Sequence, residues 1–186
     1  MASDAMVNGV DVGRLLATVE AIKADPDLAR FTFRATSEWV TGGRSRTAIQ
    51  GFYGAGQEDT SRARPFVLEG DEPPVLLGTN AAPNAVEAVL HALASCLAVG
   101  FIYNAAARGI KVERLQFALE GDLDLRGFLG LSDRVRPGYQ KIRLSYQVKA
   151  DAPREEIVAL CDYVQKTSPV LDILRNPVSV SVSLAD

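Results

Sequence analysis

Apolar and polar residues alternate along several stretches of the chain, and this period of two predicts β-strands. Residues 31–40 alternate, residues 45–53 are expected to form the return strand, and residues 64–70 a short third strand. Alternation recurs in residues 110–125, 142–148 and 178–184. Gly42 and Gly43 separate the first two stretches, so these are expected to form a hairpin. Each strand should turn its apolar face toward a core, because successive side chains of a strand point to opposite faces.

Other segments carry apolar residues at helical spacing. Residues 11–25 and 153–166 each predict an amphipathic helix, and a short further helix is expected to begin at Pro169. The longest helix is expected over residues 85–107, after a loop rich in proline and glycine. It should end before Gly109.

The expected order is helix, three strands, long helix, two strands, helix and strand. This order lacks the regular alternation of βαβ units, so it predicts an α+β fold with a mostly antiparallel sheet. No repeat or low-complexity linker interrupts the chain. Residues 1–186 are therefore expected to form a single domain, with residues 1–28 as an N-terminal helical extension.

The 85–107 helix raises the question of a membrane span. No charged side chain occurs from Ala88 to Ala107, and this run is long enough to cross a bilayer. The run also contains His91 and Asn104 and is rich in alanine. A helix that is apolar on all sides is buried in protein or in lipid. We favour a long buried central helix over a membrane helix, since the other segments of the chain alternate cleanly.

The composition is typical of a soluble globular protein, with 47% hydrophobic and 23% charged residues among 186 and a net charge of -3. Basic residues are spread along the chain, which argues against nucleic-acid binding. The N-terminus has acidic residues early and lacks the apolar core of a signal peptide. Two cysteines are too few for a disulfide framework. A reducing, cytoplasmic location is therefore expected.

The residues that could carry chemistry are few. The chain has one histidine, His91, and its two cysteines, Cys96 and Cys161, lie far apart in the sequence. No metal site and no cofactor are therefore expected. On a helix, His91 and Cys96 differ by about 140° around the axis. A Cys-His pair within one chain is not expected.

Several motifs resemble the OsmC/Ohr family, whose members include organic hydroperoxide reductases. The run "NAVEAVLHALASC" looks like the cysteine helix of that family, and "EPPVLLGTNAAPNAVEAVL" is similar to the loop that enters it. "TGGRSR" resembles the family's glycine-arginine turn, and "QKTSPVLDILRNPVSV" resembles its C-terminal turn and last strand. The resemblance covers the chain from residue 30 onward. It implies an OsmC-like fold and an intertwined homodimer with sites at the subunit interface.

The resemblance also implies a mechanism. Cys96 matches the cysteine whose thiolate attacks the distal peroxide oxygen, and Arg44 matches the arginine that holds the thiolate. Arg46 shares a strand face with Arg44 and is a candidate substitute. A free cysteine has a pKa of about 8.5, which a nearby cation must lower. The alternatives are a buried, inert Cys96 and a solvated Arg44.

The family's glutamate has no direct match. In the peroxidases it ends an Asn-Pro-Glu triplet ten residues before the cysteine, and Val86 occupies that position here. Glu87 is one place late and lies about 180° around the helix from Cys96. Asn84 and Glu87 instead have the spacing of a capping box, which is the favoured interpretation.

The second family cysteine, which precedes a proline in the C-terminal turn, is replaced by Ser168 before Pro169. Ser168 is also a good N-cap, with Pro169 at the first helical position. Cys161 lies seven residues earlier. It is either an accessory thiol that resolves the sulfenic acid of Cys96 or an inert buried residue.

Two functions follow from the resemblance. In the first, the protein reduces organic hydroperoxides through a sulfenic acid on Cys96 that an external thiol resolves. In the second, the fold and pocket serve a small-molecule binder or a redox sensor with no peroxidase cycle. The retained Cys96 and Arg44 favour the first, and the replaced second cysteine and the displaced glutamate favour the second.

Overall fold

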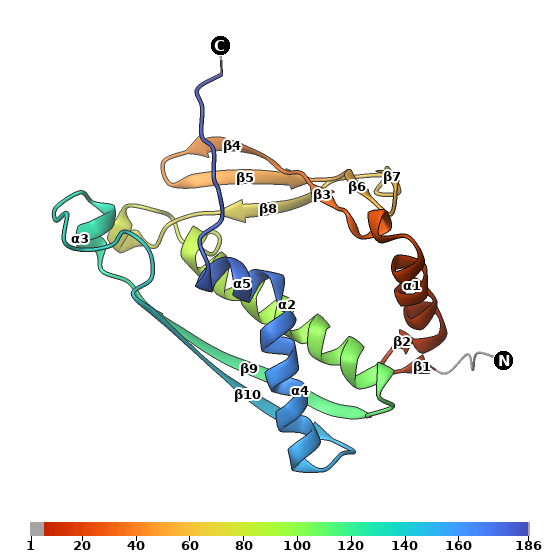
Figure 1. Ribbon diagram of the computed structural model, residues 1–186. Helices are drawn as coiled ribbons and strands as arrows, with labels where there is room; N and C mark the ends of the chain where they lie inside the picture. Colours follow the sequence, from red (N-terminus) through yellow and green to blue (C-terminus); the bar gives the residue numbers. More distant parts are fainter. Residues whose placement is uncertain (1–5, 186) are drawn as a thin grey trace. The chain divides into compact units, whose positions relative to one another are not determined.

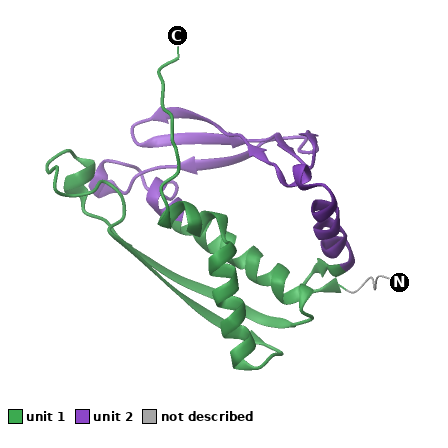
Figure 2. Cartoon of the chain, in the orientation of Figure 1, with its two compact units in different colours: residues 1–12, 90–186 green, residues 13–89 purple. Residues whose placement is uncertain are grey.

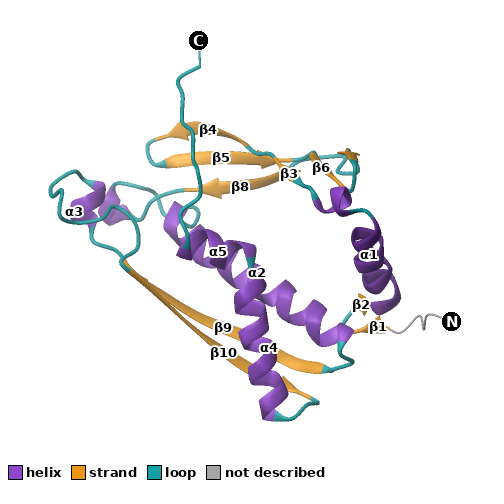
Figure 3. Ribbon diagram, in the orientation of Figure 1, coloured by secondary structure: helices purple, strands orange, loops and turns teal. Residues whose placement is uncertain are grey.

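The computed structural model describes residues 6–185, and the chain divides into two compact units (Figure 2). One unit comprises residues 1–12 and 90–186, and the other comprises residues 13–89. The α+β character with antiparallel pairing is confirmed (Figure 3). A single domain stays a prediction.

The larger unit is built from a β-hairpin with helices packed on one face (Figure 1). Its elements are α2 (Ala85–Ala107, which begins in the other unit), β9 (Val112–Asp122), α3 (Leu125–Phe128), β10 (Lys141–Ala150), α4 (Arg154–Thr167) and α5 (Pro169–Arg175). β9 and β10 pair antiparallel, with Leu119 opposite Leu144 and Phe117 opposite Tyr146. The helices and strands predicted between residues 85 and 175 are confirmed, and α3 was not predicted.

The core of this unit lies between the hairpin and the helices. It consists of Leu93, Leu97, Phe101, Ala105, Ile110, Leu160 and Val164, each at most 4% exposed. The apolar faces of β9 and β10 pack against this cluster, as the alternation predicted. α2 and α4 therefore share one core, and this packing positions Cys96 and Ser168.

A short N-terminal hairpin is tied to this unit. It consists of β1 (Met6–Val7) and β2 (Val10–Asp11), joined by Asn8 and Gly9, both with positive φ. The Asn8 amide donates to the Ile110 carbonyl and accepts from the Val112 N–H, each at 2.9 Å. Asn8 thereby satisfies backbone groups at the start of β9. An Asn-Gly pair between apolar residues is typical of a β-hairpin, so this hairpin could have been predicted from the sequence.

The unit of residues 13–89 begins with most of α1 (Val12–Ala24), which confirms the helix expected over residues 11–25. A 3-10 turn, η1 (Pro26–Ala29), follows. Two three-stranded antiparallel sheets come next, in the orders β3-β6-β7 and β4-β5-β8. Their strands are β3 (Thr32–Phe33), β4 (Thr36–Thr41), β5 (Arg44–Ile49), β6 (Phe52–Gly54), β7 (Gln57–Asp59) and β8 (Phe66–Gly70).

The prediction of one continuous strand over residues 31–40 and another over 45–53 is wrong, because the chain passes from one sheet to the other within each stretch. The breaks fall between β3 and β4 and between β5 and β6. At the second break, Gln50 and Arg62 each donate a side-chain hydrogen bond to the other's carbonyl. These bonds replace ladder pairing, and alternation alone cannot report such a change of sheet.

The last strand expected at residues 178–184 is absent from the described residues. The chain runs on from α5 without strand pairing (Figure 1), and Val180, Val182 and Leu184 are 75%, 92% and 99% exposed. The alternation is intact, but a strand also needs a neighbour with free backbone groups. No strand among residues 6–185 pairs with this segment in the structure.

α2 is less buried than expected. Its length and composition would suit a membrane span, but core helices of soluble proteins pass the same test. One stripe of α2 lies in the core, whereas Val99 and Tyr103 are 46% and 47% exposed. A fully buried central helix is therefore wrong for the single chain. The choice between a core helix and a membrane helix stays a prediction in favour of the core.

Candidate functional site

A complete capping box fixes the start of the helix that carries Cys96. The Asn84 side chain accepts a hydrogen bond from the Glu87 N–H, and the Glu87 carboxylate accepts one from the Asn84 N–H, both at 2.9 Å. Glu87 also stands at the positive end of the helix dipole. The capping interpretation of Glu87 is confirmed.

The loop before this helix is organised around one carboxylate. Asp71 is 2% exposed and accepts hydrogen bonds from the Glu72, Thr79 and Ala81 N–H groups and from the Thr79 hydroxyl. The Ala81 N–H and the Thr79 hydroxyl lower the pKa of Asp71 from 3.8 to about 2. A Cβ at Gly78 would lie 1.8 Å from the Glu72 carbonyl oxygen, so the fold of the loop requires glycine there.

Replacing Asp71 with asparagine should lower the melting temperature by roughly 5 °C or more at pH 7. An amide nitrogen cannot accept the N–H donors that converge on this side chain. The pKa of Asp71 is lower in the folded state, so its contribution is fully present above pH 3.8 and is lost as the pH falls toward 2. Melting curves between pH 2 and pH 7 should show the two proteins converging at the acid end.

The control for this prediction is Asp27→Asn, which alters an exposed ion pair with Arg30. That variant should melt close to the wild type, since surface pairs contribute little. A melting temperature of Asp71→Asn equal to that of the control would contradict the role given to Asp71.

Cys96 lies near the middle of α2 and is half-buried. The Ser168 hydroxyl donates to the Cys96 sulfur, with an Oγ–Sγ distance of 3.2 Å. Ser168 is 5% exposed, so this contact is largely shielded from solvent. His91 instead faces Ser95, at 3.5 Å between His91 Nε2 and Ser95 Oγ. Cys96 and His91 therefore have different hydrogen-bond partners.

Two features of the chain bring Ser168 to Cys96. Gly100 lets α4 pass close to α2, because a Cβ there would approach Val164 Cγ1 to 3.1 Å. Ser168 follows α4 directly and caps α5, accepting from the Leu171 N–H at 3.3 Å, with Pro169 at the first turn. The predicted N-cap role of Ser168 is confirmed, and the same hydroxyl also donates a hydrogen bond to the Cys96 sulfur.

Cys161 is not placed beside this contact. It lies seven residues before Ser168 on α4, about 10 Å along the helix axis, and it lines a pocket against β10. A disulfide needs Cα atoms within about 7 Å. Both cysteines are free thiols, and burial raises the pKa of Cys161. Resolution of Cys96 by Cys161 therefore stays a prediction.

Arg44 and Arg46 converge on a glutamate that the sequence interpretation missed. Arg44 Nη2 lies 2.9 Å from one carboxylate oxygen of Glu69, and Arg46 Nη2 lies 3.0 Å from the other. Hydrogen bonds from Arg44 and then Arg46 lower the pKa of Glu69. Glu69 is the cross-strand neighbour of Arg46 in the β5–β8 pair, and this register could not be read from the sequence pattern.

The structure thus forms two separate clusters of the expected site residues. One joins Cys96 to Ser168, and the other joins Arg44 to Arg46 through Glu69. The arginines belong to the unit of residues 13–89 and the cysteine to the other unit. The pairing of Arg44 with Cys96 therefore stays a prediction.

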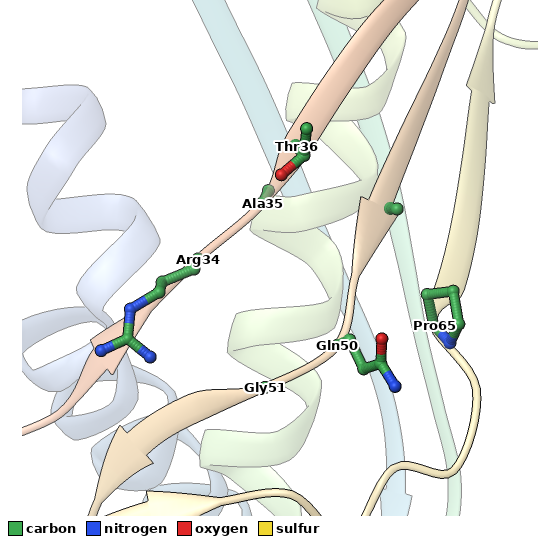
Figure 4. Close-up of a pocket in the computed structure, with 7 residues that line it drawn as sticks. Arg34, Ala35, Thr36, Gln50, Gly51 and Pro65 are labelled. Atoms are coloured by element: carbon green, nitrogen blue, oxygen red, sulfur yellow. The ribbon is translucent and has the colours of Figure 1, made fainter.

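The unit of residues 13–89 also contains a pocket of about 300 Å³ (Figure 4). Two of its three polar side chains are already engaged: Arg34 pairs with Glu58 through two hydrogen bonds, and Gln50 donates to the Arg62 carbonyl. The third is Thr36, and one hydroxyl alone does not make a convergent polar site. Among residues 6–185, no three His, Cys, Asp or Glu side chains gather as metal ligands would.

Comparison with known protein families places the chain in one of them. Residues 78–183 match the family model described as OsmC-like protein, which covers more than half of the chain and includes Cys96 and Ser168. A search of curated proteins found no match.

Solved structures give the same fold. An OsmC-like protein from Mycoplasma pneumoniae superposes with a TM-score of 0.60 at 17% identity, over 78% of this chain and 89% of that one. An organic hydroperoxide resistance protein OsmC from Legionella pneumophila gives a TM-score of 0.51 at 17% identity, over 77% and 89%. A putative osmotic stress induced and detoxification response protein from Psychrobacter arcticus gives 0.56 at 12% identity, over 74% and 85%.

Proposed function

Because the chain belongs to the OsmC-like protein family, we propose that it reduces organic hydroperoxides through Cys96, with an external thiol completing the cycle. The observation that carries the proposal is the half-buried thiol on α2 that receives a hydrogen bond from Ser168. The family is associated with organic hydroperoxide resistance, as the name of the Legionella pneumophila protein states. Burial raises the pKa of Cys161, which disfavours its thiolate and hence its use as a nucleophile.

The chemistry proceeds in two stages. The Cys96 thiolate attacks the terminal oxygen of the hydroperoxide, a sulfur–oxygen bond forms, and the oxygen–oxygen bond breaks. Sulfur loses two electrons, and the leaving alkoxide takes a proton to become an alcohol. An external thiol then attacks the sulfenic acid, releases water and forms a mixed disulfide. A second thiol cleaves this disulfide and returns Cys96 to its reduced state.

Ser168 gives this cycle a one-cysteine form. Its hydroxyl donates a hydrogen bond to the Cys96 sulfur at 3.2 Å. A serine cannot form a disulfide, so the sulfenic acid must await a thiol from outside. Electrons therefore reach Cys96 from a small-molecule or protein thiol rather than from a second cysteine of the chain.

We assign the electrostatic part of the site to Arg44, supported by Arg46 and Glu69. The family's usual glutamate is absent, since Val86 is in its place and Glu87 caps the helix. Glu69 supplies a carboxylate that binds both guanidinium groups. It is a positioning residue in this account, because it acts through Arg44.

Replacing Glu69 with glutamine should lower kcat/KM for cumene hydroperoxide about tenfold, since loss of a charge-assisted bond frees the Arg44 side chain. The effect should shrink as the pH approaches the acid range, where the wild-type carboxylate also becomes protonated. Steady-state rates measured against pH test both statements. Glu58→Gln breaks an ion pair with Arg34 elsewhere in the same unit and should leave the rate unchanged.

We also propose that the active form is a homodimer. The unpaired segment at residues 178–184 retains perfect alternation, and strands β4 and β8 end their sheet as unpaired edges. Exposed apolar side chains on these strands, such as Trp39 at 74% and Phe66 at 61%, support a covering partner. Sedimentation at micromolar concentration should give twice the chain mass, and a lone monomer would contradict the proposal.

The function is tested by following cumene hydroperoxide consumption with dithiothreitol as the reductant. Saturable turnover that exceeds the uncatalysed reaction supports the enzyme. The second candidate is a small-molecule binder or redox sensor, favoured by Ser168 in place of a second cysteine. Oxidation of Cys96 by one equivalent of hydroperoxide without further turnover under excess thiol would support the sensor.

A further inference from the structure

The loop that joins β9 to β10 presents large apolar side chains to solvent. Phe128, Leu129 and Leu131 are 67%, 55% and 70% exposed, and none of them belongs to the core of the unit. They lie at the end of α3, which stands at the end of the β9–β10 hairpin (Figure 1). Single exposed leucines are common on protein surfaces, but several large apolar side chains gathered in one loop mark an interaction surface.

The backbone of this loop is closed by its own hydrogen bonds. The Leu131 N–H donates to the Arg126 carbonyl at 2.8 Å and the Gly130 N–H to the Gly127 carbonyl at 3.3 Å, which is the Schellman pattern of a helix end. Gly130 has the positive φ, 67°, that this pattern requires. A Cβ at Gly127 would lie 2.6 Å from the Arg136 carbonyl oxygen, so α3 packs directly against the returning chain. The exposed side chains are therefore presented by a closed, capped turn.

Two guanidinium groups accompany the apolar side chains. Arg134 and Arg136 are exposed, and the ion pairs formed among residues 6–185 do not include them. Arg126 is instead paired with Asp124. The whole chain has a net charge of -3, so this basic character is local to the loop.

The combination of charge and apolar surface defines the partner. Free guanidinium groups beside exposed apolar side chains suit a surface that is anionic at its rim and apolar beneath, as a bilayer of acidic phospholipids is. A symmetric contact of this loop with the same loop of a second copy would bring four like charges together. The membrane surface is therefore the better match.

From these features we infer that the loop docks on an anionic phospholipid bilayer. Phe128, Leu129 and Leu131 enter the interface and leave water. Arg134 and Arg136 bind phosphate oxygens of the head groups, which the planar guanidinium group suits. The contact is peripheral and does not use α2, and it is independent of the proposed hydroperoxide reduction.

Flotation of the full chain with lipid vesicles tests the docking directly. Vesicles of phosphatidylcholine with about one third phosphatidylglycerol should carry the protein with them, and vesicles of phosphatidylcholine alone should bind it about thirtyfold more weakly, because both arginines lose their anionic partner. Binding to the mixed vesicles should weaken as the salt concentration rises. Equal binding to the two kinds of vesicle, or binding to neither, would overturn the inference.

Replacing Arg134 and Arg136 together with glutamine should weaken binding to the mixed vesicles about thirtyfold. The matched control replaces Arg30 and Arg64, two exposed arginines of the other unit, with glutamine and so changes the net charge equally. The control should bind as the wild type does. An equal loss in both double variants would be a general charge effect and would contradict the assignment to this loop.

A tryptophan reporter identifies the side chains that enter the lipid. The chain has a single tryptophan, Trp39, so Trp39→Phe removes the native signal. In that background, lipids brominated in their acyl chains should quench the fluorescence of Phe128→Trp. They should not quench Val75→Trp, which lies at a strongly exposed position of the other unit. Quenching of both reporters, or of neither, would contradict insertion of this loop.

The competing occupant of the surface is a second copy of the chain. The double variant Phe128→Ser with Leu131→Ser should lose vesicle binding and keep the sedimenting mass of the wild type. A smaller mass with vesicle binding retained would make the loop a contact between copies, and the inference would be wrong. If this variant does not fold, the arginine variants decide the question, since they alter only exposed side chains.

Discussion

Replacing Cys96 with serine should lower the rate of organic hydroperoxide reduction about a thousandfold or more, because the attacking atom is removed. Serine is nearly the same size and can keep a hydrogen bond to Ser168, so the helix packing should survive. The control is Cys161→Ser, which removes the other thiol of the chain. That variant should retain the wild-type rate, since Cys161 lies about 10 Å along α4 from Ser168.

Both variants should be assayed with cumene hydroperoxide and dithiothreitol, after subtraction of the uncatalysed rate, and with their melting temperatures in hand. Equal activity of Cys96→Ser and the wild type would remove Cys96 from the mechanism. Loss of activity in Cys161→Ser alone would transfer the role to the α4 thiol and require movement of that helix.

Replacing Ser168 with cysteine should convert the protein from a one-cysteine to a two-cysteine cycle. The Ser168 oxygen lies 3.2 Å from the Cys96 sulfur, so a thiol there is within a small adjustment of a sulfur–sulfur bond of about 2.05 Å. One equivalent of cumene hydroperoxide should then produce an internal disulfide and consume both thiols. In the wild type, the same treatment should leave a sulfenic acid that reacts with dimedone.

The control is Thr167→Cys, one residue earlier. The Thr167 hydroxyl donates to the Tyr163 carbonyl, so its side chain points back along α4 rather than toward Cys96. Mass spectrometry of cleaved, unreduced protein should find the Cys96 disulfide in Ser168→Cys and not in Thr167→Cys. A disulfide in both variants, or in neither, would contradict the local geometry.

The helices of the larger unit and its strands β9 and β10 could be predicted from the sequence. The two strands are consecutive along the chain, and the helices begin at recognisable capping residues. The alternation along β10 predicted which of its residues pack on the core. The spacing of Asn84 and Glu87 predicted where α2 begins. The N-cap role of Ser168 was readable from the proline that follows it. In each case the determining interaction is local or lies along one strand.

The features that could not be predicted from the sequence depend on contacts between residues that are distant in the chain. The register that sets Glu69 opposite Arg46 is fixed by strand pairing, which a strand pattern alone does not specify. The contact of Ser168 with Cys96 depends on the close crossing of α2 and α4 at Gly100. The segment at residues 178–184 has the pattern of a strand, but no strand among residues 6–185 pairs with it, and the pattern alone does not name a partner.

The central claim is that a hydroperoxide oxidises Cys96 and that a thiol from outside the chain restores it. The most direct measurement mixes reduced protein with one equivalent of cumene hydroperoxide, adds dimedone after a few seconds and maps the adduct by mass spectrometry. The account predicts a dimedone adduct on Cys96 and none on Cys161, and no adduct when dithiothreitol is added before dimedone. A Cys96 thiol that stays reduced after an hour in excess hydroperoxide would contradict it.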